Sequence, residues 1–389
     1  MRYSLLLLLI FSYLFVSAQD TSRLQISLLT CSPGEDLYAT FGHSALRVID
    51  SVSHTDVVYN YGTFNFEEPG FYTKFIRGKL LYSLSAADFS SFKDSYEYEQ
   101  RSMTEQVLNL SGSGKIKMVD LLRTNLKPQN KYYKYDFLFD NCTTRLRDLL
   151  EKSADSSLHY TPVLKQKMTF RELIHVYLDQ GKEPWSKFGI DLLLGSKTDA
   201  VMKVREVMFL PDFLMYSFDN GTIGVKPIVA INHSVYEVVK KTKTTRLLPG
   251  PLFIFSLLLI LIILLSFFKN AIINRILILF DIFFFFVIGL AGIIILFMWI
   301  GTEHVMCSNN YNIIWALPSH AVAAFFLNSK RKWLTTYFLT TAAIDLLLLL
   351  SWCILPQGLN ISFLPLILLL IYRSLAFYKF KKNHARPIR

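Results

Sequence analysis

Cys142 is the residue in this sequence best suited to act as a nucleophile. A cysteine attacks a carbonyl carbon only as the thiolate, so its ordinary pKa of roughly 8.5 has to be lowered. Asn141, directly before it, suits the N-cap of a helix, which would place Cys142 in the first helical turn. The free backbone N–H groups and the dipole at that end of a helix favour an anion. They can also donate to the oxyanion that forms when a carbonyl is attacked.

His43 is the candidate for the base that such a thiol needs. Histidine titrates near neutrality, so it can take the thiol proton and later return it to a leaving group. It follows Gly42, which lets the backbone turn closely, and it begins a predicted strand. A third polar group usually orients a histidine of this kind. We choose Asn60 on the neighbouring predicted strand, with Tyr61 and His54 as alternatives.

Two other interpretations of Cys142 stay open at this point. It could be a buried cysteine, packed as a small hydrophobic group beside a structural histidine. In an oxidising compartment it could also form a disulfide with Cys31, which would remove the nucleophile. We interpret Cys307 and Cys353 as structural. The four cysteines do not have the spacing of a disulfide framework or of a zinc site. We expect neither a metal nor an organic cofactor.

Short strands and helices are predicted around these residues. They indicate an α+β domain in which a small antiparallel sheet is packed by helices. Runs of β-branched and aromatic residues predict strands at 24–29, 43–49, 57–61 and 103–110, and the polar turn 50–56 would join the second and third as a hairpin. Apolar residues three and four apart predict helices at 71–77, 89–99 and 116–126.

Two further local patterns lie in the same part of the chain. Residues 32–35 (SPGE) have the form of a capping box with proline at the first helical position, which predicts the start of a helix. The many Phe and Tyr residues between positions 59 and 98 are interpreted as hydrophobic core.

The second half of the 389-residue chain has the composition of a membrane domain. The composition changes at residues 241–251, after which long apolar runs carry almost no charge. About five runs are long enough to cross a hydrocarbon layer of ~30 Å. They are residues 252–268, 276–300, 313–327, 334–355 and 363–380. The third run is the weakest, because Pro318, Ser319 and His320 interrupt it.

The distribution of charge predicts the orientation of these spans. Residues 1–18 have an arginine, an apolar run and a final alanine, which predicts a signal peptide cleaved after Ala18, with an uncleaved anchor as the alternative. The loops 269–275 and 328–332 and the tail 381–389 are rich in Lys and Arg, so they are expected in the cytoplasm. Residues 19–250 would then form an exported domain before a transmembrane domain at 251–380. The net charge of +11 belongs largely to these loops and the tail, so we expect no nucleic-acid partner.

Five stretches of the exported half resemble a known family. The sequence is similar to the exported N-terminal domain of the Bacteroidetes lipoprotein N-acyltransferase family (Lnb) over most of residues 28–150. The stretches are TCSPGEDLYATFGHSALRV, VVYNYGTFNF, FYTKFIRGKLLYSL, RSMTEQVLNL and YYKYDFLFDNCTTRLRDLL. The membrane half is also similar in layout, with a loop containing Thr302, Glu303 and His304 and an Asn-rich stretch after it.

The resemblance implies a permuted papain/NlpC-like fold in which histidine precedes cysteine. It implies Cys142 as nucleophile and His43 as base. Related folds use varied third members, so Asn60 remains our choice from the residues. We expect accessory or substrate-binding roles for a second group of residues, namely Tyr61, Asn141, Glu303 and His304.

The activity implied by the resemblance is lipoprotein N-acyl transfer at the bacterial cytoplasmic (inner) membrane. Cys142 would take an acyl chain from a membrane phospholipid as a thioester. The α-amine of the diacylated N-terminal cysteine of a lipoprotein would then receive it, which makes phospholipid, diacylated lipoprotein and membrane lipids the expected partners. The alternatives are an exported cysteine hydrolase with the same dyad, either a phospholipase or a cell-wall peptidase, and a non-catalytic membrane scaffold.

Overall fold

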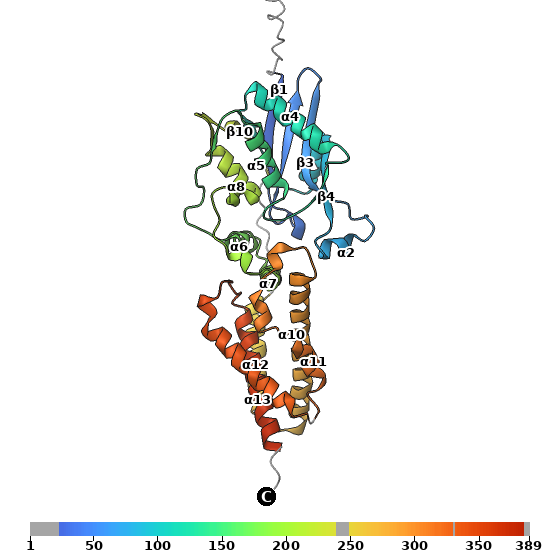
Figure 1. Cartoon of the computed structure of the whole chain (residues 1–389), viewed down its shortest axis with the longest axis vertical. Coiled ribbons are helices and arrows are strands. Elements are labelled where there is room, and N and C mark those ends of the chain that lie inside the picture. Colours follow the sequence, from blue (N-terminus) through green and yellow to red (C-terminus); the bar gives the residue numbers. More distant parts are fainter. Residues whose placement is uncertain (1–22, 239–248, 330, 385–389) are drawn as a thin grey trace, which may run out of the picture.

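The computed structural model describes residues 23–238, 249–329 and 331–384. The predicted signal segment 1–18 lies outside these residues, as do most of the predicted boundary 241–251 and residues 385–389 of the predicted tail. The described chain has two parts stacked end to end. One is built on a β-sheet and the other is a bundle of helices (Figure 1).

A seven-stranded antiparallel sheet forms the centre of the first part. Its order is β10-β5-β1-β2-β3-β4-β6. The strands are β1 (Leu24–Cys31), β2 (His43–Asp50), β3 (Thr55–Thr63), β4 (Leu81–Asp88), β5 (Met103–Leu108), β6 (Tyr132–Lys134) and β10 (Val229–Tyr236). The four predicted strands and the hairpin between β2 and β3 are confirmed. The sheet is larger than predicted because β4, β6 and β10 also pair into it.

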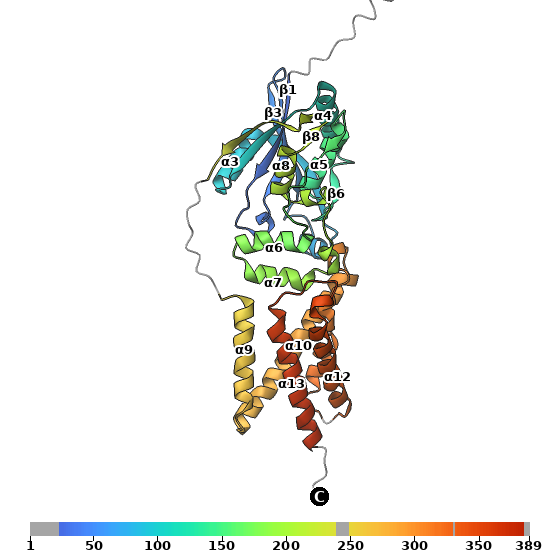
Figure 2. The same cartoon turned by 90° about the vertical axis from the view of Figure 1, so that its left-hand side faces the viewer.

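Both faces of the sheet are covered by helices, and because side chains alternate along a strand, neighbouring residues of β1 pack in different cores. Ile26 and Leu28 of β1 pack on one side, in the core that α4 (Gly112–Leu126) and α5 (Cys142–Ser153) complete. Leu29 belongs to a smaller core on the other side. Figure 2 shows α3 (Phe89–Tyr98) on that side and α4, α5 and α8 (Pro211–Asp219) on the first. The α+β architecture is therefore confirmed.

The helix expected from residues 32–35 is absent among the described residues of this segment. Only a short 3-10 turn, Leu37–Ala39, follows. The physical reason is that Ser32 does not cap anything. Its backbone N–H donates to the carbonyl of Ser102 at 2.9 Å, and its hydroxyl accepts the N–H of Ser102 at 2.9 Å. A partner 70 residues away thus uses the groups that a capping box would need.

A pair of helices lies between the sheet and the membrane half (Figure 2). These helices, α6 (Phe170–Gln180) and α7 (Pro184–Leu193), were not predicted. Thr169 is the N-cap of α6. Its hydroxyl accepts the N–H of Glu172, and the Glu172 carboxylate accepts the N–H of Thr169. Phe170, Leu173 and Leu178 of α6 are buried in a core of their own together with Phe209.

The second part consists of α9 (Pro251–Ser266), α10 (Ala271–Ile300), α11 (Ser319–Phe325), α12 (Trp333–Leu350) and α13 (Phe363–His384). Within the described ranges, α10 and α12 are long and apolar enough to cross a membrane, and α9 is a shorter apolar helix. The predicted number of five spanning helices is therefore not confirmed.

Residues 313–327 do not form the single span that was predicted. α11 has seven residues, which is far short of the ~20 that a spanning helix needs. α11 and the residues just before it pack closely on α10 at two glycines. A Cβ on Gly289 would lie 2.0 Å from the backbone nitrogen of Ala321, and one on Gly292 would lie 1.8 Å from the carbonyl oxygen of Ala316. The packing of these two segments thus depends on backbone-to-backbone contact.

A buried ion pair ties helices of the bundle together. Arg373 of α13 donates from Nε and Nη2 to the carboxylate of Asp281 on α10, at 2.7 and 2.8 Å. Its Nη1 also donates to the hydroxyl of Ser266 on α9 at 3.1 Å. Because an unpaired charge inside an apolar bundle is costly, this pairing fixes the register of the three helices.

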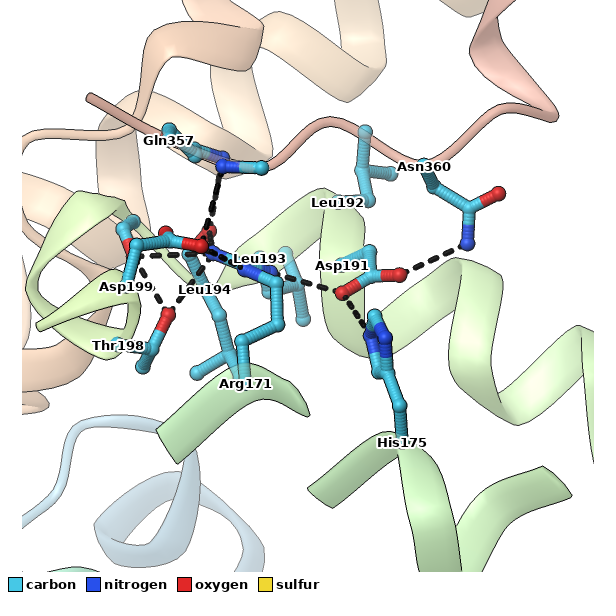
Figure 3. A network of polar contacts seen from close by, with 12 residues as sticks. Arg171, His175, Asp191, Leu192, Leu193, Leu194, Thr198, Asp199, Gln357 and Asn360 are labelled. Carbon is cyan, nitrogen blue, oxygen red and sulfur yellow. Dashed lines mark hydrogen bonds and ion pairs between the residues drawn. The ribbon is translucent and has the colours of Figure 1, made fainter. Parts of the chain in front are cut away.

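A second polar network joins the two parts of the molecule (Figure 3). The carboxylate of Asp191, at the end of α7, is bonded at 2.8 Å by each of Arg171, His175 and Asn360. Asn360 comes from the loop before α13, so the contact crosses from one part to the other. Arg171 and Asp191 are buried. The α6–α7 pair is therefore held on the helical bundle by directional hydrogen bonds to a buried carboxylate.

Candidate active site

The structure brings Cys142, His43 and Asn60 together from three different elements. Cys142 is the first residue of α5, His43 is the first residue of β2, and Asn60 lies on β3. The predicted N-cap is confirmed. Asn141 accepts the N–H of Thr144 at 2.9 Å, and its own N–H donates to the Thr144 hydroxyl at 2.8 Å. This reciprocal capping box places the thiol at the N-terminal end of the helix.

The start of α5 is anchored further by a distant segment. The side-chain amide of Asn141 donates to the carbonyls of Phe137 and Phe209, at 2.7 and 2.8 Å. The hydroxyl of Thr143 donates to the same Phe209 carbonyl at 2.7 Å. Asn141 and Thr143 are buried. Since a fully satisfied buried network is rigid, the position of Cys142 is well defined.

His43 is oriented by Asn60. Its Nε2 lies 2.5 Å from Oδ1 of Asn60. An amide oxygen can only accept, so Nε2 carries the proton and Nδ1 is left to interact with Cys142. Gly42 precedes this histidine with φ of +79°, and a Cβ there would lie 2.7 Å from the carbonyl oxygen of Cys31. The predicted close turn at Gly42 is therefore confirmed.

The surroundings of Cys142 favour the thiolate. Burial opposes ionisation of Cys142, but the charge of His43 and a hydrogen bond from it favour the thiolate. The backbone N–H groups of Ser44 and Thr143 act in the same direction, so the pKa of Cys142 lies below its ordinary value. Burial likewise opposes the charged form of His43, yet the Cys142 thiolate and the bond to Asn60 raise the pKa of His43. Both shifts favour the thiolate–imidazolium form of the pair, which is the reactive form of such a dyad.

The disulfide alternative is contradicted, because all four cysteines are free. Cys31 lies opposite His43 in the register of β1 and β2, and it is fully buried. Burial raises the pKa of its thiol to about 12. Cys31 is therefore a protonated packing group beside the site, and the activated sulfur is that of Cys142.

A cavity of about 680 Å³ opens beside this group. Cys142, His43 and Asn60 line one part of it, and aromatic side chains make up much of the remainder. Five of these aromatics follow one another along the chain between β3 and β4, namely Phe64, Phe66, Phe71, Tyr72 and Phe75, and a sixth, Tyr82, lies on β4. His304, in the loop after α10, also lines the cavity. The cavity therefore extends from the dyad to the membrane half.

The prediction that the aromatics between 59 and 98 form core is wrong for part of this set. Tyr72 is 71% exposed, Phe66 56% and Phe75 49%, whereas Phe92 is buried as expected. These three belong to the segment that carries α2 (Phe71–Ile76), and Tyr98 at the end of α3 is also exposed, at 91%. The abundance of aromatic residues in the sequence does indicate an apolar region, but composition alone does not distinguish the wall of a cavity from a core.

Tyr61 and His54 do not lie with the dyad. Tyr61 is buried in the core and its hydroxyl accepts a hydrogen bond from Asn125 at 2.7 Å. His54 lies in the turn after β2, whereas His43 begins that eight-residue strand. At ~3.3 Å per residue, the two histidines are roughly 20 Å or more apart.

Glu303 and His304 connect the two parts of the molecule. The carboxylate of Glu303 pairs with Lys134 at 2.5 Å and with Lys79 at 3.7 Å. The ring of His304 donates from Nε2 to the carbonyl of Phe75, in α2, at 3.0 Å. The expectation that Glu303 and His304 contact substrate therefore has a geometric basis only for His304, at the wall of the cavity.

Arg101 is a member of the cavity wall that the sequence did not indicate. It is buried, and it donates to the carbonyl of Ser32 and to the carboxylate of Glu99, both at 2.8 Å. Its Nη2 has no hydrogen-bond partner among the described residues. The guanidinium also lies over the ring of Tyr96, with 4.6 Å from its central carbon to the ring centroid. It supplies a fixed positive charge near the dyad.

Two family models match the chain. The model described as the Lnb N-terminal periplasmic domain matches residues 15–176, which include His43, Asn60 and Cys142. The model described as the Lnb transmembrane domain matches residues 242–384, which include all of the described bundle. No curated protein and no solved structure matches the chain.

Proposed function

The chain belongs to the Lnb family, and from this premise we propose that it is a lipoprotein N-acyltransferase whose nucleophile is Cys142. It is an inner-membrane protein with a periplasmic N-terminal domain. The observation that supports the proposal most directly is the placement of the Cys142–His43–Asn60 group in an aromatic cavity that reaches the loop after α10.

In the first step, the Cys142 thiolate attacks an ester carbonyl of a membrane phospholipid. The oxyanion that forms lies at the first turn of α5, where the backbone N–H of Cys142 has no acceptor within the helix. As the intermediate collapses, the ester C–O bond breaks and the imidazolium of His43 protonates the departing alkoxide. The products are a lysophospholipid and an acyl thioester on Cys142.

In the second step, the α-amine of a diacylated lipoprotein N-terminus attacks the thioester carbonyl. The neutral His43 accepts a proton from that amine, the C–S bond breaks, and the sulfur leaves as thiolate. The product is an amide, and Cys142 and His43 return to their starting ionisation states. Asn60 holds the imidazole through both steps, because Nε2 keeps the same proton while Nδ1 exchanges one.

A lipid ester fits this cavity better than a cell-wall peptide. The aromatic wall of the cavity provides few hydrogen-bonding partners for a peptide backbone, and burying unpaired polar groups against such a wall is costly. The cavity also reaches the membrane half, where both lipid substrates reside. Tethering to that surface raises the effective concentration of both substrates.

The finer features of the fold are part of the same proposal. The order of histidine on an early strand and cysteine at a later helix N-terminus is the order of a permuted papain/NlpC-like domain. We propose that residues 19–250 act as the catalytic domain and that the basic tail 381–389 lies in the cytoplasm. We also propose that the membrane part at 251–380 crosses the bilayer about five times, with residues 313–327 crossing as short pieces packed on α10 and not as one helix. Residues 1–18 would act as the signal peptide.

The decisive experiment uses the full chain in phospholipid vesicles with a synthetic diacylated lipopeptide. Mass spectrometry should detect an N-acylated lipopeptide, and brief incubation without acceptor should detect an acyl group on Cys142. Cys142→Ser and His43→Ala should abolish both products. Cys353→Ser is the matched control, because this thiol is free and exposed in a loop of the bundle, and it should retain full activity. Release of fatty acid without any amide product would instead identify a hydrolase.

A further inference from the structure

We propose that the aromatic side of the cavity binds the acyl chain attached to Cys142, and that this channel opens sideways toward the membrane beside α2. The inference rests on the proposed function and adds a substrate-binding site to it. The ligand is the hydrocarbon chain of a membrane lipid.

The channel begins at the nucleophile. A Cβ built on Gly62 would lie 3.8 Å from Cβ of Cys142 and 3.7 Å from the ring of Tyr135, so these two side chains lie on either side of the same small gap. Tyr135 stacks on Tyr82, with 4.4 Å between ring centroids. A carbonyl bound to the sulfur of Cys142 therefore has an aromatic wall directly beside it.

The wall continues without interruption toward α2. Tyr82 contacts Phe64 edge to face, with 5.3 Å between centroids, and Phe64 lies 5.9 Å from Phe71. Phe71 is the first residue of α2 and stacks on Phe75 at 6.1 Å. The whole cavity, about 680 Å³, is within the range of ~300–1,000 Å³ that is usual for ligand pockets.

The far end of this wall is open. Phe71 is buried, but its neighbours in the cavity lining, Phe66, Tyr72 and Phe75, are each about half exposed or more. Ile76, at the end of α2, is 49% exposed. A soluble domain rarely leaves so many large apolar side chains together on its surface without a ligand or membrane to cover them.

The open end lies beside a membrane span. The carbonyl of Phe75 accepts a hydrogen bond from His304, and the carbonyl of Arg77 accepts the N–H of Glu303 at 3.0 Å. Glu303 and His304 follow directly after α10, which ends at Ile300. Figure 1 shows α2 beside this end of α10.

The last turn of α10 is apolar and exposed, as the opening is. Phe297 and Ile300 of α10 are exposed like Phe75 and Ile76, so exposed apolar side chains lie both at the end of the span and at the opening. An acyl chain could move from the bilayer into this channel without its methylene groups entering water. A phosphate-bearing headgroup or a peptide would be disfavoured along the aromatic stretch, because neither finds polar partners there.

The test compares long and short acyl donors on the purified full chain. The first burst of p-nitrophenol, together with intact mass, reports acylation of Cys142 by p-nitrophenyl palmitate and by p-nitrophenyl butyrate. Phe66→Glu and Phe75→Glu place a carboxylate at the opening, at positions that are exposed and so tolerate the change. Each should lower the palmitate-to-butyrate rate ratio by about tenfold or more. Tyr98→Glu, at a 91% exposed aromatic at the end of α3, should leave the ratio unchanged.

An unchanged ratio in both opening variants, with normal acylation of the unmodified chain, would overturn the acyl-chain site and leave the proposed function standing. Absence of acyl-Cys142 from both esters in the unmodified chain would instead remove the proposed function, and this inference with it. A second readout does not depend on turnover. Cys142→Ala in vesicles of phosphatidylcholine with a diazirine in its acyl chain should be photolabelled within residues 64–76, whereas label confined to the membrane helices would contradict the channel.

Discussion

The ring of His43 is held by Asn60 through a 2.5 Å contact at Nε2, which leaves its other nitrogen for Cys142. Asn60 acts through His43, so we assign it a positioning role. Asn60→Ala should reduce kcat by about 10- to 100-fold, because the free energy of one hydrogen bond to a charged group corresponds to a rate factor of about that size. Because the bond from Asn60 raises the pKa of His43, its loss should also move the alkaline limb of the pH–rate profile to lower pH. Asn60→Asp keeps an acceptor and should restore most of the rate, and an unshifted profile in Asn60→Ala would contradict the positioning role.

Alkylation by iodoacetamide measures the ionisation of Cys142 without any substrate. In the unmodified chain, reaction should begin below the ordinary thiol pKa, because the contributions of His43 and of the backbone N–H groups of Ser44 and Thr143 together outweigh burial. In His43→Ala the charge and the hydrogen bond of His43 are lost while burial remains, so the pKa should rise and the rate at neutral pH should fall. The mass shift of the Cys142 peptide gives the rate, and Cys353 in the same sample is the internal reference. Equal rates in the two proteins would show that His43 does not activate the thiol.

Asn141 should matter for both stability and activity. Asn141→Ala removes the N-cap of α5 and leaves the carbonyls of Phe137 and Phe209 without these donors. The lost cap alone should cost about 1–2 kcal/mol, and the unsatisfied carbonyls add to that. Asn141→Asp should not rescue the protein, because it brings a carboxylate against two carbonyl oxygens. Thermal unfolding in detergent and the alkylation rate at Cys142 are the measurements.

Ser111→Ala is the control for that change. Ser111 caps α4 by accepting the N–H of Gly114, at a site away from the cavity lining. It should lower stability by about 1 kcal/mol and leave the reactivity of Cys142 unchanged. A similar loss of reactivity in both variants would mean that general destabilisation, not the position of the thiol, is responsible.

The junction in Figure 3 should be far more sensitive to mutation than surface ion pairs are. Arg171→Met leaves the buried carboxylate of Asp191 without its guanidinium partner, which should cost about 3–5 kcal/mol. Arg205→Met is the matched control, because Arg205 pairs with Asp148 and Glu151 while half exposed, and such pairs contribute ~1 kcal/mol or less. The midpoints of thermal unfolding in detergent compare the two. Equal midpoints would mean that the junction does not stabilise the chain.

Local signals were sufficient for the elements that hold the dyad. The Asn141 cap, the glycine before His43 and the β2–β3 hairpin are each encoded by a few adjacent residues, and each was predicted. The failures have non-local causes. The hydroxyl of Ser32 accepts a hydrogen bond from Ser102 and so does not cap a helix. The chain at 313–327 folds as short pieces that pack on Gly289 and Gly292 of α10. Neither partner can be identified from the segment itself.

The membrane-facing part of the site was the least predictable. Phe66, Tyr72 and Phe75 have the composition of a core, and only their position beside Glu303 and His304 shows that they border a cavity. α6 and α7 were missed for a related reason. Asp191 of α7 is bonded by Arg171 of α6 and by Asn360 of the bundle, so the sequence of this region alone does not show why its charge is buried.

The anchoring of Asn141 to Phe209 has a consequence for the synthesis of the chain. The two residues are 68 positions apart, so the helix start that activates Cys142 is complete only after residue 209 has emerged on the far side of the membrane. Under the proposed function, Cys142 would therefore reach its full reactivity only after residue 209 has joined the domain.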